Sequence, residues 1–260
     1  MNSQELDTTI IKIIIQNIIL AAAIWSYGLE LHADTIKVAV ASNFAATMKV
    51  ITAEFEKVTT HKVLTAFGST GKHYAQIKNG APFDAYFAAD SATPARLENE
   101  GIAIPQTRFT YAYGKIVVWS PKPNIPNIRG LLSSSDNMSQ HIAIANSRLS
   151  PYGLAASQII NNLNLSDHLA EKLVTGENIS QTFQWVHSGN AQLGFVAYSQ
   201  INNPRLASQG SYWMPPQSLY SPIDQQAVLL KDNEAARDFM SFIKSPDARK
   251  VMQHYGYDLP

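Results

Sequence analysis

The sequence predicts an α/β protein of two lobes, each a mainly parallel sheet flanked by helices, with a ligand cleft between them. Short β-branched runs alternate with amphipathic segments along most of the 260 residues, which is typical of parallel strands connected by helices. The chain also exceeds the usual size of one domain, and Pro-rich segments interrupt it around 121–126 and 204–222. We therefore expect residues 34–113 plus 224–260 to form the first lobe and 114–223 the second.

The alternation of strand and helix begins at once in the predicted first lobe. Ile36–Ala41 is a β-branched apolar run that stops at Ser42-Asn43. After this turn, apolar residues recur at helical spacing as far as Phe55, so the segment is predicted as strand, turn and amphipathic helix. The same order repeats twice, with strands at 62–67 and 85–89, a helix that contains Tyr74 and Ile77, and a helix that ends near Gly101.

The remaining apolar runs build the second lobe and the return to the first. We predict strands at 116–119, 142–145 and 193–197, and helices from 151, over 167–174 and from 179. After the second Pro-rich segment come a strand at 227–230, a helix at 232–243 and a last helix from 246 that stops at Gly256. Strands from both ends of the chain are expected to share one sheet, because a parallel sheet must bury both faces.

The N-terminal segment differs from the rest of the chain. Residues 10–25 are almost all aliphatic and precede a polar stretch that ends in Ala33-Asp34. The unbroken apolar part is too short to span a bilayer, so we predict a signal peptide over 1–33 that is cleaved after Ala33, and a periplasmic mature protein. An uncleaved N-terminal anchor is the alternative. Removal of 1–33 leaves 19 basic and 17 acidic residues, a net charge of +2.

Composition excludes several classes of function. The whole chain has 20 basic and 20 acidic residues and no basic run, so nucleic acid is not an expected partner. It contains no cysteine, which excludes disulfides, thiolate metal sites and a catalytic thiol. Its seven histidines are scattered without a metal-binding spacing. We expect no cofactor and no free metal cation.

Four predicted turns place small polar residues where a helix begins. Helix starts have unpaired N–H groups and partial positive charge, so they bind anions without a side-chain cation. Serine and threonine hydroxyls add neutral donors. Each turn taken alone is better explained by an N-cap, so the case for an oxyanion site depends on the combination. The turns are Ser42-Asn43, Ser69-Thr70-Gly71, Ser150-Pro151-Tyr152-Gly153 and Asn178-Ile179.

From Ile36 to Asp258 the chain resembles the periplasmic molybdate-binding proteins of ABC importers, which are two-lobed solute receptors of the type II periplasmic-binding-protein fold. Six motifs in family order carry the resemblance, and the Gly-Ser-Thr-Gly turn followed by Gly-Ala-Pro-Phe-Asp is the most specific. The motifs are Val38–Phe44, Phe67–Lys72, Asn79–Asp84 leading to Ala88–Asp90, Tyr111–Lys115, Ser150–Gly153 and Ser188–Ala197.

The resemblance implies a non-catalytic monomer that binds molybdate or tungstate and delivers it to the membrane permease of an ABC importer. It implies that the Ser42 hydroxyl, and the amide of Ser42 or Asn43, hold the oxyanion from the first lobe. Ser69 and Thr70 would contribute from the same side, with Thr70 favoured as the hydroxyl ligand. The backbone amides of Tyr152 and Ile179 would bind from the second lobe. Some family members add a tyrosine hydroxyl where this chain has Ala197, and the neighbouring Tyr198 is expected to point away.

Three other functions remain to be compared with this one. A receptor for another oxyanion such as sulfate is the nearest alternative. A phosphate-binding loop at Gly68–Lys72 fails because Ala66 and His73 stand where the motif needs glycine and a hydroxyl. A penicillin-binding or β-lactamase-like serine enzyme would use Ser69-Thr70-Gly71-Lys72 and Ser135-Asp136-Asn137, but the Lys-Thr-Gly element is missing.

Several residues near the predicted turns are assigned structural roles. His73 is expected to be an exposed first-turn residue, and Asp90 is expected to cap a helix. Tyr111, Tyr113 and Trp119 are interpreted as core or lobe-junction residues. Lys72 is the one cation beside the predicted site.

Overall fold

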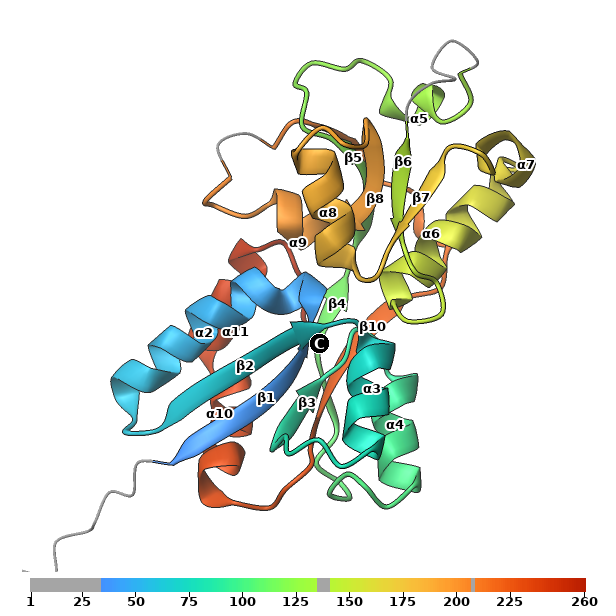
Figure 1. Ribbon diagram of the computed structural model, residues 1–260. Coiled ribbons are helices and arrows are strands. Elements are labelled where there is room, and N and C mark those ends of the chain that lie inside the picture. Colours follow the sequence, from blue (N-terminus) through green and yellow to red (C-terminus); the bar gives the residue numbers. More distant parts are fainter. Residues whose placement is uncertain (1–33, 135–140, 207–208) are drawn as a thin grey trace, which may run out of the picture. The chain divides into compact units, whose positions relative to one another are not determined.

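The computed structural model describes residues 34–134, 141–206 and 209–260. The predicted signal peptide and the Ser135-Asp136-Asn137 motif lie outside these residues. Two five-stranded sheets, with strand orders β2-β1-β3-β10-β4 and β7-β6-β8-β5-β9, each have helices on both faces (Figure 1). Within the described residues, no helix is long and apolar enough to cross a membrane.

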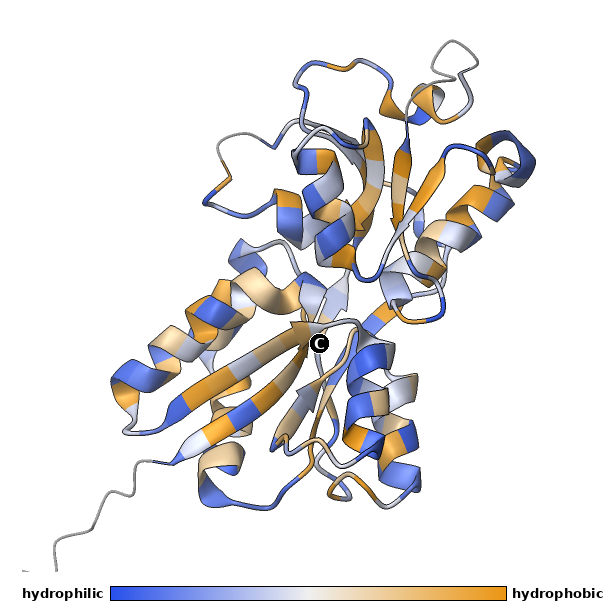
Figure 2. Ribbon diagram, viewed as in Figure 1, coloured by the Kyte–Doolittle hydropathy of each residue, from blue (hydrophilic) through white to orange (hydrophobic). Residues whose placement is uncertain are grey.

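The first lobe is built around strand β1, whose alternate residues face two separate cores. Val38 and Val40 pack with α2, α10 and α11, whereas Ala39 packs on the opposite face with residues of α3 and α4. Figure 2 shows the strands as the most hydrophobic parts of this lobe. The elements are β1 Thr35–Ala41, β2 Lys62–Gly68, β3 Ala85–Phe87, β4 Phe109–Gly114, β10 Ile223–Leu229, α2 Ala45–Val58, α3 Thr70–Lys78, α4 Ala92–Asn99, α10 Glu234–Ile243 and α11 Pro246–His254, with a 3-10 turn at Ser42–Phe44.

The second lobe repeats this plan with different helices. In strand β6, Ile142 and Ile144 face a core that includes Ile159 of α6, and Ala143 packs on the opposite face with Val186 of α8. Its elements are β5 Ile116–Ser120, β6 Ile142–Ala145, β7 Leu173–Gly176, β8 Leu193–Ala197, β9 Ser211–Trp213, α5 Ile128–Leu131, α6 Pro151–Asn162, α7 Ser166–Leu169, α8 Ile179–His187 and α9 Tyr198–Ile201, with a 3-10 turn at Gln217–Leu219.

Each sheet is mixed, with a parallel half of three strands. β1 is parallel to β2 and β3, and β6 is parallel to β7 and β8. β10 runs antiparallel to β3 and β4, and β5 runs antiparallel to β8 and β9. These reversals follow from the connections between the lobes. The parallel strands of each lobe end at the lobe junction, whereas β10 and β5 start there, so they run in the opposite direction.

The sequence predictions miss the strands β4, β7 and β9, and the first two show why. The predicted helix over 167–174 is a one-turn helix, α7, followed by strand β7, where Val174 pairs with Ala143. No strand is predicted at Phe109–Gly114, yet this segment forms β4 against β10. In both cases a partner strand far away in the sequence determines the conformation, which local periodicity does not reveal.

Candidate anion-binding site

The six predicted ligand residues all lie at ends of parallel strands or at the helix starts that follow them. Ser42 and Asn43 follow β1, and Ser69 and Thr70 follow β2 in the first lobe. In the second lobe, Tyr152 is in the first turn of α6, after β6, and Ile179 begins α8, after β7. None of the six is more than 5% exposed, as the following values show: Ser42 5%, Asn43 3%, Ser69 3%, Thr70 2%, Tyr152 1% and Ile179 2%.

Hydrogen bonds between the lobes bring these turns together. Gly71 N–H donates to the Leu149 carbonyl at 2.9 Å, next to Ser69 on one side and Ser150 on the other. The Ser42 hydroxyl donates to Asn178 Oδ1 at 3.3 Å, and Ser180 Oγ returns a bond to the Ser42 carbonyl at 3.0 Å. The Gly71–Leu149 bond joins the second turn to the residue before the third, and the two bonds at Ser42 join the first turn to the fourth.

In the first lobe, the serine hydroxyls are not used to cap helices. Ser69 occupies the N-cap position of α3 without a side-chain capping bond. Its Oγ is buried and has no hydrogen-bond partner within the protein. Because a buried, unpaired hydroxyl costs about 1 to 3 kcal/mol, Ser69 is suited to bind a ligand atom.

Thr70 differs from its neighbour, because its side-chain oxygen has a partner within the protein. Its Oγ1 accepts the Ala89 N–H at 3.0 Å, and its carbonyl accepts the Tyr86 hydroxyl at 2.8 Å. These bonds tie the start of α3 to the end of β3. The Thr70 hydroxyl still has its own proton to donate, so Ser69 and Thr70 can both serve as hydroxyl ligands and the preference for Thr70 stays a prediction.

In the second lobe, by contrast, the side chains cap the helices. Ser150 Oγ accepts the Gly153 N–H at 3.4 Å, and Asn178 Oδ1 accepts those of Ser180 and Gln181 at 3.0 and 3.1 Å. An α-helix leaves its first N–H groups without intrahelical partners. With their neighbours capped, the amides of Tyr152 and Ile179 remain available to an anion.

Asn43 is held by a buried polar network below the turn. Its Nδ2 donates to Gln225 Oε1 at 2.6 Å and to the Tyr257 hydroxyl at 3.1 Å. Its carbonyl accepts the Tyr257 hydroxyl at 3.0 Å and Ser199 Oγ at 3.3 Å. Burial raises the pKa of Tyr257, so its hydroxyl stays a neutral donor. The side chain of Asn43 thus fixes the backbone, whose amide faces the turn.

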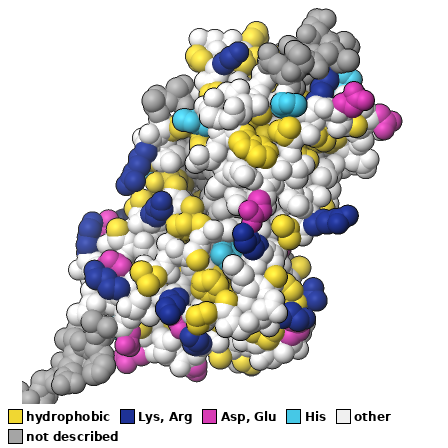
Figure 3. All heavy atoms as spheres, in the orientation of Figure 1, with side chains coloured by type: hydrophobic (Ala, Val, Ile, Leu, Met, Phe, Trp, Pro, Cys, Tyr) yellow, Lys and Arg dark blue, Asp and Glu magenta, His cyan; other side chains and the backbone are white. Residues whose placement is uncertain are grey.

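Two cations that lie beside these turns are Lys72 and the exposed Arg148, which lines the cavity between the lobes. Lys72 forms an ion pair with Glu177 of the second lobe, and both side chains are about half exposed, at 50% and 48%. Figure 3 shows cationic and anionic side chains scattered over this face without a patch of one sign. In the described parts of the chain, no cluster of three or more His, Asp or Glu side chains could hold a metal ion.

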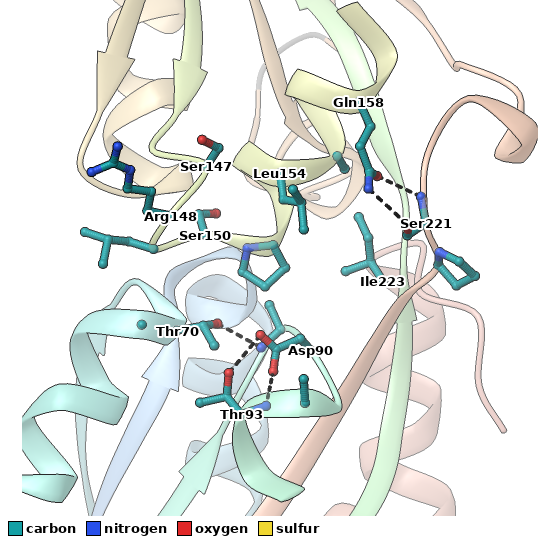
Figure 4. Close-up of a pocket in the computed structure, with 17 residues that line it drawn as sticks. Thr70, Asp90, Thr93, Ser147, Arg148, Ser150, Leu154, Gln158, Ser221 and Ile223 are labelled. Atoms are coloured by element: carbon teal, nitrogen blue, oxygen red, sulfur yellow. Dashed lines mark hydrogen bonds between the residues drawn. The ribbon is translucent and has the colours of Figure 1, made fainter. Parts of the chain in front are cut away.

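A cavity of about 260 Å³ lies between the lobes beside the turns. Figure 4 shows Thr70, Asp90 and Thr93 on one wall and Ser147, Arg148, Ser150 and Leu154 on the other. Asp90 accepts bonds from the Thr93 N–H and hydroxyl at 2.8 and 2.9 Å, in agreement with its expected role at a helix start. Burial raises the pKa of the Asp90 carboxyl, opposed by these two bonds.

Other expectations have mixed outcomes. His73 is buried, at 3% exposure, not exposed as predicted, because its ring packs under Gly68 and its Nε2 lies 3.2 Å from the Val40 carbonyl. Trp119 and Tyr111 are buried core residues as predicted, while Tyr113 is 37% exposed. Tyr198 lies outside the site, with its hydroxyl 3.4 Å from Asn202 Oδ1.

Sequence reasoning did not identify the residues that hold the turns from a distance. Gln225, Tyr257 and Ser199 each bond to Asn43, and Asn178 links both lobes at Ser42. The sequence did indicate Asn178, as a residue of the fourth predicted turn that could cap a helix. Gln225 carried no such signal, since Asp224 and Gln226 flank it in β10, although Gln225 is the fully buried residue of the three.

The geometry suits a small anion held mainly by neutral donors. The hydroxyls of the first lobe and the helix-start amides of the second belong to buried residues at turns that hydrogen bonds between the lobes hold together, and of the six predicted residues Thr70 also lines the cavity. In such a site neutral donors interact strongly with an anion, because the effective dielectric constant is low. Since donors come from both lobes, an anion would bind the closed arrangement better than an open one.

Known proteins share this architecture over nearly the full described chain. Residues 36–258 match the model of the bacterial extracellular solute-binding protein family. The molybdate-binding protein ModA of Azotobacter vinelandii is 47% identical over 231 residues, which cover 88% of this chain and 91% of that protein. ModA of Rhodobacter capsulatus is 41% identical over 239 residues, covering 91% and 93%.

A solved structure gives the same result in three dimensions. The periplasmic molybdate-binding protein of Azotobacter vinelandii superimposes with a TM-score of 0.82 at 42% identity, covering 86% of this chain and 99% of that one. The two lobes, the mixed sheets and the helix starts at the lobe junction are features of a type II solute receptor. The chain is therefore a member of the bacterial extracellular solute-binding protein family.

Proposed function

We propose that the protein is an extracytoplasmic receptor that binds molybdate or tungstate between its lobes and delivers it to the membrane permease of an ABC importer. Two features together carry the proposal. The buried Ser69 hydroxyl has no partner within the protein, and the N–H groups of Tyr152 and Ile179 lie at helix starts where the caps bind neighbouring N–H groups instead. ModA relatives at 47% and 41% identity support the choice of oxyanion.

The proposed binding set consists of Ser42, Asn43, Ser69, Thr70, Tyr152 and Ile179. Ser69 and Thr70 would donate hydroxyl bonds, and Ser42 would do so once its hydroxyl leaves Asn178 Oδ1. Asn43, Tyr152 and Ile179 would donate backbone N–H bonds. Ala197 has no hydroxyl, so in this proposal the side-chain ligands come from the first lobe.

A non-catalytic role fits the donors. The hydroxyl of Ser69 has no base beside it, since His73 faces Val40 and Gln76, and Lys72 pairs with Glu177. A nucleophilic serine would need an adjacent base within hydrogen-bond reach. The receptor would act as a monomer in the periplasm, after cleavage behind Ala33, without a cofactor and without nucleic acid.

Calorimetric titration of the purified protein with molybdate, tungstate and sulfate tests the proposal. We expect tight binding of the first two anions and much weaker binding of sulfate. The smaller sulfate would leave some buried donors stretched, at about 1 to 3 kcal/mol for each lost bond. Equal affinity for sulfate would favour the general oxyanion receptor, and binding of none of the three would overturn the proposal.

A further inference from the structure

Gln225 lies in β10, the strand by which the chain returns to the first lobe, opposite a bulge in β4. Gln225 pairs with Ala112 and Gln226 with Thr110, so Tyr111 is the extra residue of β4. Such a bulge changes the direction of the local side chains. The Gln225 side chain is fully buried, at 0% exposure.

One end of the Gln225 carboxamide is bonded to the first lobe. Its Oε1 accepts Asn43 Nδ2 at 2.6 Å and the Tyr111 hydroxyl at 3.2 Å. Because Asn43 supplies a backbone amide to the proposed anion site, Gln225 supports that amide from below. The other end, Nε2, is buried and has no hydrogen-bond partner within the protein.

A second unpartnered atom lies beside it and comes from the second lobe. The Tyr152 hydroxyl is also buried without a partner, on a side chain 1% exposed. A Cβ placed on Gly114 would lie 2.4 Å from this hydroxyl and 3.1 Å from Gln225 Nε2. The two atoms therefore border the same small space, which exists because residue 114 is glycine.

The Tyr152 hydroxyl is a neutral donor throughout the physiological range. Burial raises the pKa of Tyr152 well above its ordinary value, and the neighbouring Tyr257, Tyr111 and Tyr220 add to the shift. Two buried donors without acceptors are costly, so we expect Gln225 Nε2 and the Tyr152 hydroxyl to complete a hydrogen bond in this space. A hydroxyl can also accept, and one water has room for two to four bonds.

We propose that Gln225 is a positioning residue for both sides of the anion site, holding Asn43 through Oε1 and linking through Nε2 to the Tyr152 hydroxyl, directly or by one ordered water. Tyr152 is then fixed at two points: its N–H binds the anion, and its hydroxyl is held by Gln225 of β10. This role rests on the proposed function, since it makes the affinity for the anion depend on a contact that does not touch it.

The test compares molybdate affinity and dissociation rate among Tyr152→Phe, Gln225→Met and Gly114→Ala proteins and their pairs. We expect Tyr152→Phe to weaken affinity about 3- to 10-fold, chiefly through faster dissociation, because it loses one bond and keeps the amide and ring. Gly114→Ala should weaken it about 10-fold or more, because its Cβ displaces the hydroxyl. Tyr220→Phe, which removes another buried hydroxyl of the second lobe, is the matched control and should change affinity less than 2-fold.

Rescue and non-additivity distinguish the link from general loss of packing. Adding Tyr152→Phe to Gly114→Ala should restore affinity to the level of Tyr152→Phe alone, and Gln225→Met should add little to Tyr152→Phe. Independent, multiplicative effects of Tyr152→Phe and Gln225→Met would overturn the inference, even if Gly114→Ala did not fold. If the unaltered protein bound no molybdate, the proposed function would fail. The same double-variant cycle on unfolding temperature would then decide the link by itself.

Discussion

The two lobes have the same arrangement of strand ends and helix starts at the cleft, but they differ in whether side chains cap those helix starts. In each, a central parallel strand and its outer neighbour end at helix starts, β1 and β2 in the first lobe and β6 and β7 in the second. In the first lobe, no side chain caps the turn at Ser42 or the start of α3. In the second, Ser150 and Asn178 cap α6 and α8.

This difference shows how similar sequences can supply different donors. A hydroxyl oxygen that accepts a capping N–H leaves the neighbouring N–H groups of the helix in place and well oriented. The Ser69 hydroxyl does not cap and has no partner, whereas the Ser42 hydroxyl donates to Asn178 Oδ1. We therefore expect the first lobe to offer mainly side-chain hydroxyls and the second to offer backbone N–H groups. The variants below test this division from the largest expected effect to the smallest.

Exchange of the two N-cap serines for alanine should give opposite results. Ser69→Ala should lower molybdate affinity about 10- to 100-fold, the loss of a hydrogen bond to a charged group, with little change in unfolding temperature. Ser150→Ala should lower stability by about 1 kcal/mol through loss of a cap, with a smaller effect on affinity. Calorimetric titration and thermal unfolding of both variants measure this. Equal affinity losses in the two variants would show that the hydroxyl donors do not come mainly from the first lobe.

The pH dependence of stability tests what holds the Ser69 turn. Burial lowers the pKa of His73, which packs under Gly68, and bonds to Gln76 and Val40 oppose the shift. A histidine whose folded pKa is below its unfolded value near 6.5 favours the neutral form. Its contribution is present above pH 6.5 and is lost as pH falls below that value.

Thermal unfolding between pH 8 and pH 5 measures this contribution. The unfolding temperature should fall over that range, and His73→Gln should flatten the decline while leaving the hydrogen-bonding positions filled. A decline of the same size in the variant would assign the pH dependence to other groups.

The smallest effect is expected at the ion pair between the lobes. Lys72→Gln removes the partner of Glu177, but both side chains are about half exposed. Such pairs contribute about 0 to 1 kcal/mol and are screened by salt. Molybdate affinity should therefore change by less than about 5-fold at low ionic strength and by less still in 0.5 M salt. A loss as large as that of Ser69→Ala would mean that a cation, and not neutral donors, governs anion binding.

The sequence by itself determined the alternation of strand, turn and helix, and hence where the candidate turns lie. Ile36–Ala41, Ile142–Ala145 and Leu193–Ala197 were placed within a residue of their observed bounds, because buried strands and amphipathic helices differ in local period. Small polar residues at the predicted helix starts then pointed to the turns that contain Ser42, Ser69, Tyr152 and Ile179, since helix starts depend mainly on neighbouring residues.

Only the tertiary structure decided which atoms at those turns are free. Ser69 and Thr70 look alike in sequence, but Ala89, 19 residues away, engages Thr70. The support of Asn43 comes from Gln225, 182 residues away, and the pairing of Lys72 from Glu177, 105 residues away. Local patterns carry no information about such partners, because a hydrogen bond between distant residues exists only after the strands that carry them have paired and the lobes have met.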